Sequence, residues 1–244
     1  GQSLRVNWTV ENQGIGVTNI DQWSDSVYLA RDPAGSQAAF YLGNFSHYGK
    51  IAPNLSYERS VDVTIPNGLT GQYYLVVKTG GPYEFIYNNN NLRVIGPINI
   101  QLSDSPDLVV TDVTAPTNAI EGDPIDISWT IANSGLGNAN GSWIDTVSLR
   151  RVDIAGGATI QLGQFTYDRG GLAAGASYTR TERFTLPTKS EGIYQIVIST
   201  NTGAVVYEYG SAALNDTYTD AQTTTVGLKP RPDLQVSSAI VPDR

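Results

Sequence analysis

Apolar and polar residues alternate along most of this chain, which is the pattern of half-buried β-strands. In residues 124–132 the apolar side chains from Ile125 to Ile131 occupy every second position. The same period of two recurs in residues 143–151 and 192–199. Turn-forming pairs of Asn and Gly separate these segments, and no stretch keeps a helical period. The sequence therefore predicts an all-β protein.

The second half of the chain predicts a complete β-sandwich. Seven or eight short antiparallel strands joined by turns are typical of the immunoglobulin or fibronectin type III fold. We expect strands near residues 107–113, 124–132, 143–151, 159–166, 176–186 and 192–199, and a last one at 204–208 or 221–228. The tryptophans fall on core positions of these strands, so we expect four core anchors, Trp8, Trp23, Trp129 and Trp143.

The chain contains an internal repeat. Residues 1–16 correspond to residues 122–137 at an offset of 121, with tryptophan, asparagine and glycine at matching places. Residues 106–116 correspond without a gap to residues 232–242 at an offset of 126, beginning with Pro-Asp-Leu in both. The first repeat thus has no counterpart of residues 106–121, and the chain ends on the opening segment of a third repeat.

This organisation predicts two tandem β-sandwiches plus the first strand of a third. We expect a first sandwich at residues 1–105 that lacks its opening strand, and a second, complete sandwich at residues 106–231. Residues 232–244 would then be the opening strand of a following repeat.

The combined motifs resemble the CARDB domain, a bacterial cell-adhesion-related module. They are Pro-Asp-Leu at 106–108, Trp-Thr-Ile-x-Asn-x-Gly at 129–135, Gly-Ser-Trp-x-Asp-x-Val-x-Leu at 141–149, Gly-x-Tyr at 192–194 and Tyr-Glu at 207–208. The resemblance covers nearly the whole chain, once per repeat. It implies β-sandwiches used in tandem within large secreted or surface proteins. The expected location is therefore extracellular or at the cell surface of a prokaryote. The resemblance supplies no catalytic residue.

Composition excludes several functions. The formal net charge of −8 would repel a phosphate backbone, so we expect no nucleic-acid partner. No apolar run is long enough to predict a membrane span. The chain has no cysteine and a single histidine, which removes thiolate and most imidazole chemistry. We therefore expect no enzyme activity and no cofactor, with calcium as the one exception.

Two aspartates, Asp25 and Asp145, share a strand face with core residues, so each buried carboxylate must find donors. A structural role, with the carboxylate accepting loop amides, is the favoured interpretation. Calcium, which prefers oxygen ligands, is the alternative. The candidate ligands are Asp145 together with loop carbonyls or, as an alternative cluster, Asn215, Asp216 and Asp220.

A sandwich that lacks its first strand exposes a strand edge and apolar side chains, which another segment must cover. The C-terminal segment has the alternation that such a strand needs. We expect its donor side chains to be Leu234, Val236, Ala239, Ile240 and Val241. The acceptor is either the next repeat of the same polypeptide or an identical chain, arranged head to tail.

Either arrangement produces an array. We therefore expect a non-enzymatic structural segment of an extracellular filament, stalk or adhesin, built by strand complementation. The alternative is a carbohydrate-binding or adhesive module that binds surface glycans. Aromatic rings can stack on sugars, and the candidate tyrosines are Tyr48, Tyr83, Tyr87, Tyr207 and Tyr209.

Overall fold

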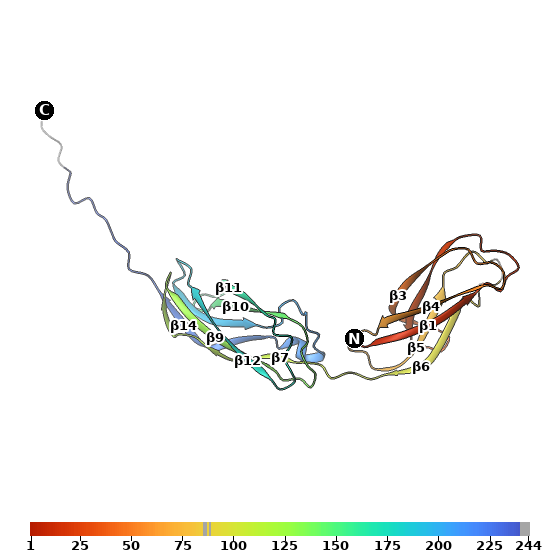
Figure 1. The fold of residues 1–244 in the computed structure, drawn as a ribbon. Helices are drawn as coiled ribbons and strands as arrows, with labels where there is room; N and C mark the ends of the chain where they lie inside the picture. The colour runs from red at the N-terminus through yellow and green to blue at the C-terminus, as the bar shows by residue number, and fades with distance from the viewer. Residues whose placement is uncertain (85–86, 88, 240–244) are drawn as a thin grey trace, which may run out of the picture. The chain divides into compact units, whose positions relative to one another are not determined.

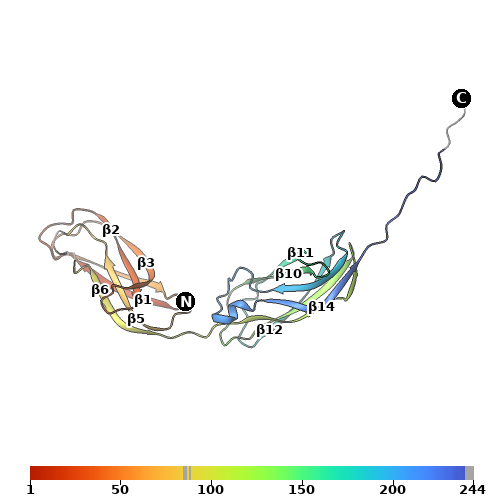
Figure 2. The same cartoon turned by 180° about the vertical axis from the view of Figure 1, so that it is seen from behind.

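The computed structural model describes residues 1–84, 87 and 89–239. Contacts divide the chain into two units, Gly1–Ser103 and Asp104–Arg244. Each unit consists of two layers of β-strands (Figures 1 and 2), which confirms the all-β sandwich fold. In the described part of the chain, no helix is long and apolar enough to cross a membrane.

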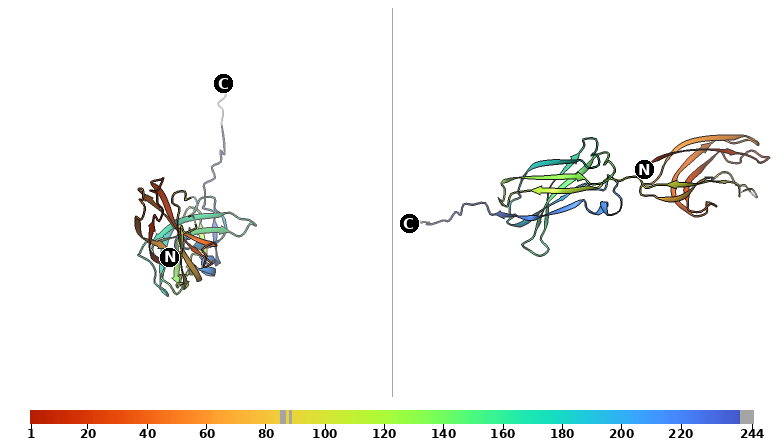
Figure 3. Two further views of the ribbon diagram at one scale, coloured as in Figure 1. Left: turned by 90° about the vertical axis from the view of Figure 1, so that its right-hand side faces the viewer. Right: turned by 90° about the horizontal axis from the view of Figure 1, so that it is seen from below.

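The second unit packs a three-stranded sheet against a five-stranded sheet (Figure 3). The smaller sheet has the order β12 (Ser177–Thr185), β9 (Pro124–Asn133), β7 (Leu108–Thr114). The larger sheet has the order β11 (Thr159–Tyr167), β10 (Trp143–Arg151), β13 (Gly192–Ser199), β14 (Thr217–Gly227), β8 (Asn118–Ile120). All pairs are antiparallel except β14 with β8.

The first unit has the same strand order with fewer strands. One sheet has two strands, β1 (Ser3–Glu11) and β4 (Ser56–Thr64). The other has the order β3 (Ala38–Tyr48), β2 (Gln22–Ala30), β5 (Gly71–Thr79), β6 (Leu92–Ile100). Strands β1 and β4 correspond to β9 and β12. Among the described residues, the first unit has no counterpart of β7 or β8.

Residues 204–208, one of two places expected for the last strand, form a loop followed by the short 3-10 helix η1 (Gly210–Leu214). The amide of Asn201 explains the difference. Its Oδ1 accepts the backbone N–H of Val206 at 2.9 Å, and its Nδ2 donates to the Val206 carbonyl at 2.8 Å. Because both main-chain groups of Val206 are taken, this segment cannot extend a sheet there, and β14 is the last strand.

The core follows the predicted alternation. In β9 the side chains of Ile127, Trp129 and Ile131 are fully buried, and Trp143 on β10 is 1% exposed. The first unit buries Val6 and Trp23 in the same way, but Trp8, the counterpart of Trp129, is only half-buried. Three of the four expected core anchors are therefore buried, and the fourth lies at an incompletely covered sheet.

A fully buried carboxylate joins the two sheets of each unit. In the second unit, Asp145 on β10 accepts hydrogen bonds from Trp129 Nε1 at 3.0 Å, Tyr178 Oη at 2.6 Å and Thr200 Oγ1 at 2.8 Å. Trp129 and Tyr178 belong to β9 and β12 of the opposite sheet. All three donors are thus side chains, two of them across the sandwich, rather than the loop amides expected from the sequence.

The first unit repeats this arrangement. Asp25 on β2 is fully buried and accepts from Trp8 Nε1 at 2.8 Å and from Tyr57 Oη at 2.7 Å. Burial, followed by the hydrogen bond to Asp25, raises the pKa of Tyr57 to about 12. Burial and the Asp145 charge likewise raise the pKa of Tyr178. Both phenols therefore stay protonated, as donation to a carboxylate requires.

Stacked aromatic rings support each tyrosine. Tyr167 lies between Trp143 and Tyr178, with ring centroids 4.3 Å apart on both sides. In the first unit His47 takes the place of Tyr167, at 4.3 Å from Trp23 and 3.9 Å from Tyr57. The single histidine of the chain is therefore part of the packing between the sheets.

We predict that Tyr178→Phe lowers the free energy of unfolding of the second unit by about 1.5–3 kcal/mol, the usual contribution of a hydrogen bond to a charged group. The substitution removes the donor at 2.6 Å from Asp145 and leaves the ring stack in place. Denaturant unfolding measures the change, with Tyr218→Phe on the more exposed strand β14 as control. Equal losses in the two variants would contradict the role given to this bond.

Candidate functional site

The candidate functional site is the edge of strand β9 on which β7 lies in the second unit, which we call the seat of β7. β7 pairs with β9 along one edge of the smaller sheet. Its side chains Leu108 and Val110 are 0% and 7% exposed and belong to the core cluster. This strand completes the cover over Trp129 and its neighbours, which are fully buried.

Main-chain groups at the start of β7 are held by side chains and loops of the same unit. Asn133 Oδ1 accepts the N–H of Asp107 at 3.0 Å, and the N–H of Ser134 donates to the Asp107 carbonyl at 2.7 Å. The N–H of Leu108 donates to the carboxylate of Glu208, which is 6% exposed. Because a buried charge needs donors, Glu208 makes the position of Leu108 specific.

Two glycines let the segment before β7 approach closely. A Cβ on Gly135 would lie 2.5 Å from the carbonyl oxygen of Ser105 and 2.6 Å from the nitrogen of Asp107. A Cβ on Gly137 would collide with Asp104 in the same way. Glycine is therefore required at both positions by contact with the incoming backbone.

The corresponding edge of the first unit is open. Among the described residues, β1 pairs only with β4. Leu4, Trp8 and Val10 are half-buried, whereas their β9 counterparts Ile125, Trp129 and Ile131 are 6%, 0% and 0% exposed. The difference in burial is what the lack of a β7 counterpart predicts.

The groups that hold β7 also have counterparts in the first unit. Asn12 corresponds to Asn133, and Glu84, after Tyr83, corresponds to Glu208 after Tyr207. Glu84 Oε2 is buried and has no hydrogen-bond partner among the described residues. A Cβ on Gly16, the counterpart of Gly137, would meet no described atom within 4 Å. The first unit therefore has counterparts of the residues that hold β7, with no strand on them in the described part of the chain.

The predicted strand-donor segment is exposed in this structure. Residues 228–239 form no helix or strand (Figure 1), and Leu234 and Val236 are 94% and 85% exposed. Ala239 is exposed too, while Ile240 and Val241 lie outside the described residues. Arg231 pairs with the buried carboxylate of Glu121. This pair ties the start of the segment to the second unit.

The candidate calcium ligands lie in different settings. Asp145 is already bound by three donors. Asn215 Nδ2 donates to Asp107 Oδ1 at 3.0 Å, and Asp220 Oδ1 accepts the N–H of Gln222 at 3.0 Å. In the part of the chain that the structure describes, no three His, Cys, Asp or Glu side chains are grouped to hold a metal ion. Calcium binding by Asp145, Asn215, Asp216 and Asp220 stays a prediction.

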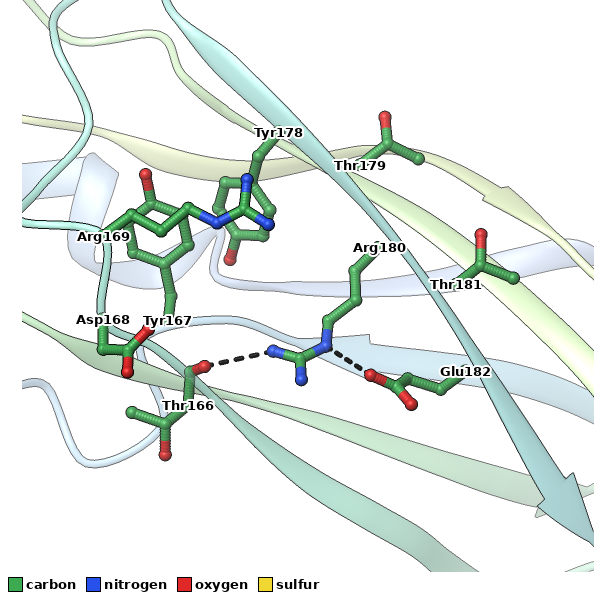
Figure 4. A pocket seen from close by; sticks show the side chains of 9 residues that line it. All are labelled: Thr166, Tyr167, Asp168, Arg169, Tyr178, Thr179, Arg180, Thr181 and Glu182. Atoms are coloured by element: carbon green, nitrogen blue, oxygen red, sulfur yellow. Dashed lines mark hydrogen bonds and ion pairs between the residues drawn. The ribbon is translucent and has the colours of Figure 1, made fainter.

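A polar hollow on the second unit is lined by residues 166–169 and 178–182 (Figure 4). Arg180 crosses it, donating to Glu182 at 2.7 Å and to the carbonyl of Thr166 at 3.1 Å. Its guanidinium also lies 4.8 Å from the Phe165 ring centroid. Because these contacts join β12 to β11 on the other sheet, Arg180 has a structural role at the sandwich edge.

The glutamates at 84 and 208 were not among the site residues expected from the sequence. The signal was present, since the Tyr-Glu pair recurs in both repeats ahead of an Asn-containing loop. Its function could not be deduced without the fold, because Glu208 acts on Leu108, 100 positions earlier.

A second acid beside this seat is sensitive to pH. Burial, then the hydrogen bond to Glu208 and the charges of Glu208 and Asp107, raise the pKa of Asp216 from 3.8 to about 7. Asp216 Oδ1 is buried without a hydrogen-bond partner among the described residues. The raised pKa of Asp216 and its buried oxygen without a partner are consistent with each other if Asp216 is protonated and donates to the Glu208 carboxylate.

We predict that the stability of the second unit falls as pH rises from about 4 to 7 through this group. In that range folded Asp216 holds a proton that the unfolded chain releases, so rising pH favours unfolding. Asp216→Asn should flatten this part of the pH profile of denaturant unfolding. Asp112→Asn, which removes the same charge from an exposed position of β7, is the control. An unchanged slope in Asp216→Asn would contradict the assignment.

Three comparisons with known proteins show what this chain is similar to. Residues 105–220 match the CARDB family model. The CARDB domain of a Pyrococcus furiosus protein, solved as a crystal in complex with di-metal ions, is 18% identical with a TM-score of 0.39 and covers 53% of this chain and 100% of that one. Its solution structure is 17% identical with a TM-score of 0.37, covering 51% and 97%.

A transglutaminase of red sea bream is 13% identical with a TM-score of 0.30, covering 94% of this chain and 30% of that one. No protein of curated function matches the chain. The family-model match spans β7 to β13 and the first part of β14, the strands that build the second sandwich. Residues 105–220 of this chain therefore form a CARDB domain.

Proposed function

We propose that this chain is a structural segment of an extracellular or cell-surface array, in which residues 232–244 complete the next sandwich. CARDB is a non-catalytic domain family of surface and secreted proteins, which supports a structural role outside the cell. A stalk, filament or adhesin is the kind of assembly that such repeats build.

One observation carries the proposal: the second unit has strand β7 on the edge that is open in the first unit. The segment that begins at Pro232 has the same opening residues, Pro-Asp-Leu, as the segment at Pro106 that leads into β7. Its apolar side chains Leu234 and Val236 stand at the positions of Leu108 and Val110. An exposed donor segment and an open edge thus occur in one chain.

The energy of such docking is appreciable. Fully burying Leu234 and Val236, now 94% and 85% exposed, would contribute about 3–6 kcal/mol before the cost of ordering the segment. Ladder hydrogen bonds to β1 would add to this, because among the described residues β1 pairs only with β4 and residues 228–239 form no strand. Burial of these side chains therefore favours docking of the segment.

The array forms either along one longer polypeptide or between identical chains. Both routes use the same contact between the segment and the first unit. The C-terminal segment of one 244-residue chain should therefore bind the first unit of another in both cases.

We predict that the chain associates head to tail in solution, with an average mass that rises with concentration above the 26.2 kDa of a monomer. Leu234→Asp should abolish association, because it places a charge where the counterpart Leu108 is fully buried. Leu228→Asp adds the same charge to an exposed position before the docking segment and should associate like the wild type. Sedimentation velocity and electron microscopy measure the assemblies.

Two outcomes would contradict the proposal. One is a wild-type chain that stays monomeric up to its solubility limit. The other is equal association of the Leu234→Asp and Leu228→Asp variants, which would place the contact elsewhere.

A further inference from the structure

We infer that Glu84 fixes the register in which the C-terminal segment of a second copy docks, by accepting the backbone N–H of Leu234. Asn12 accepts the N–H of the preceding residue, Asp233, in the same contact. This inference rests on the proposed function and adds to it the groups that recognise the segment.

The second unit supplies the template. There the N–H of Leu108 donates to Glu208, and the N–H of Asp107 donates to Asn133 Oδ1 at 3.0 Å. Two successive main-chain donors are thus bound by the Glu208 carboxylate, in the loop after β13, and by the Asn133 amide, at the end of β9. Since main-chain amides occur at every residue, the fixed positions of these two acceptors select the register.

Glu84 has the properties of a hydrogen-bond acceptor for such a main-chain N–H. Its Oε2 is buried and has no hydrogen-bond partner in the described part of the chain. A buried carboxylate oxygen without a donor is costly, so an incoming N–H would relieve that cost. In the second unit the counterpart Glu208 also receives Asn201 Nδ2 at 2.8 Å.

Asn12 is already oriented for its part. Its Nδ2 donates to the carbonyls of Gly16 at 2.8 Å and Ile51 at 2.9 Å, as Asn133 Nδ2 does to Gly137 and Leu172. These bonds fix the amide plane. They leave Oδ1, which accepts the N–H of Gly14 at 3.0 Å, with capacity for a second donor.

The glycines give the incoming backbone room. Gly14 and Gly16 correspond to Gly135 and Gly137, where a Cβ would collide with the segment before β7. In the first unit a Cβ on Gly16 would meet no described atom, so nothing within that unit requires glycine there. A docked segment with Pro232 at the position of Pro106 would pass close to Gly16 and would require glycine there.

A side-chain contact adds specificity. The N–H of Thr79 donates to the Asn91 carbonyl at 2.9 Å, and the N–H of Thr200 donates to the Asp216 carbonyl at 2.8 Å. Asn91 therefore corresponds to Asp216. The residues before them, Asn90 and Asn215, correspond to each other as well. Asn215 Nδ2 donates to the carboxylate of Asp107, whose counterpart is Asp233. The acid of the Pro-Asp-Leu motif is therefore matched by Asn90.

The same alignment removes a repulsion. Where Glu208 faces the acid Asp216, the first unit has the uncharged Asn91. A register slip by one residue would place Leu234 and Val236 on the solvent face and would withdraw both N–H donors from their acceptors. Polar and apolar contacts thus favour one register.

A labelled peptide of residues 228–244 tests this when titrated against the full chain carrying Leu234→Asp, whose own segment cannot compete. Replacing the Asp233–Leu234 amide of the peptide by an ester removes the one N–H donor and keeps every side chain. We expect the ester to weaken binding about ten-fold to a hundred-fold, as loss of a hydrogen bond to a charged group does.

Glu84→Ala in the protein should weaken binding of the amide peptide to a similar extent. The ester should then bind this variant no more weakly than the amide does, because both changes remove the same bond. Glu58→Ala, an exposed acid on β4, is the control for lost negative charge, and an ester at Leu228–Lys229 is the control for the peptide chemistry.

The outcomes separate the two proposals. A peptide that binds equally with amide or ester overturns the role of Glu84 and leaves strand docking intact. So does additive weakening by the ester and Glu84→Ala. A peptide that does not bind at all contradicts the proposed function itself.

Discussion

The buried carboxylate between the sheets is the constraint on which each sandwich depends. A carboxylate inside the core needs hydrogen-bond donors, and Trp129 and Tyr178 of the opposite sheet both donate to the buried Asp145. This requirement fixes the spacing and the relative placement of the two sheets. The first unit meets the same requirement with Asp25, although its smaller sheet has, among the residues that the structure describes, only β1 and β4.

Because the carboxylate network uses β9, β10 and β12, the opening strand is not part of it. β7 is held by its apolar side chains and by acceptors that bind main-chain groups, such as Glu208 and Asn133. A strand held in this way can be supplied by another segment without disturbing the connection between the sheets. Separation of the sheet-joining contacts from the strand-holding contacts would allow repeats to share strands in the way that we propose.

The sequence predicts the strands and most of the core because alternation is a local pattern, as in Ile127, Trp129 and Ile131. It could not predict the donors of Asp145, since Tyr178 and Thr200 are 33 and 55 positions away. The loop at 204–208 could not be predicted either. The main-chain groups of Val206 are hydrogen-bonded by the side chain of Asn201, which the local pattern does not reveal. Long-range polar contacts are thus what the sequence alone could not predict.

Docking and the stability of the first unit should be coupled. Glu84 Oε2, which has no hydrogen-bond partner among the described residues, and the half-buried Trp8 both raise the free energy of the open unit. One incoming strand would satisfy the first and cover the second. A ligand that binds only the folded state stabilises it by mass action. In an array each repeat would therefore be least stable before its neighbour docks, so completion of one sandwich by the next favours a continuous assembly over isolated repeats.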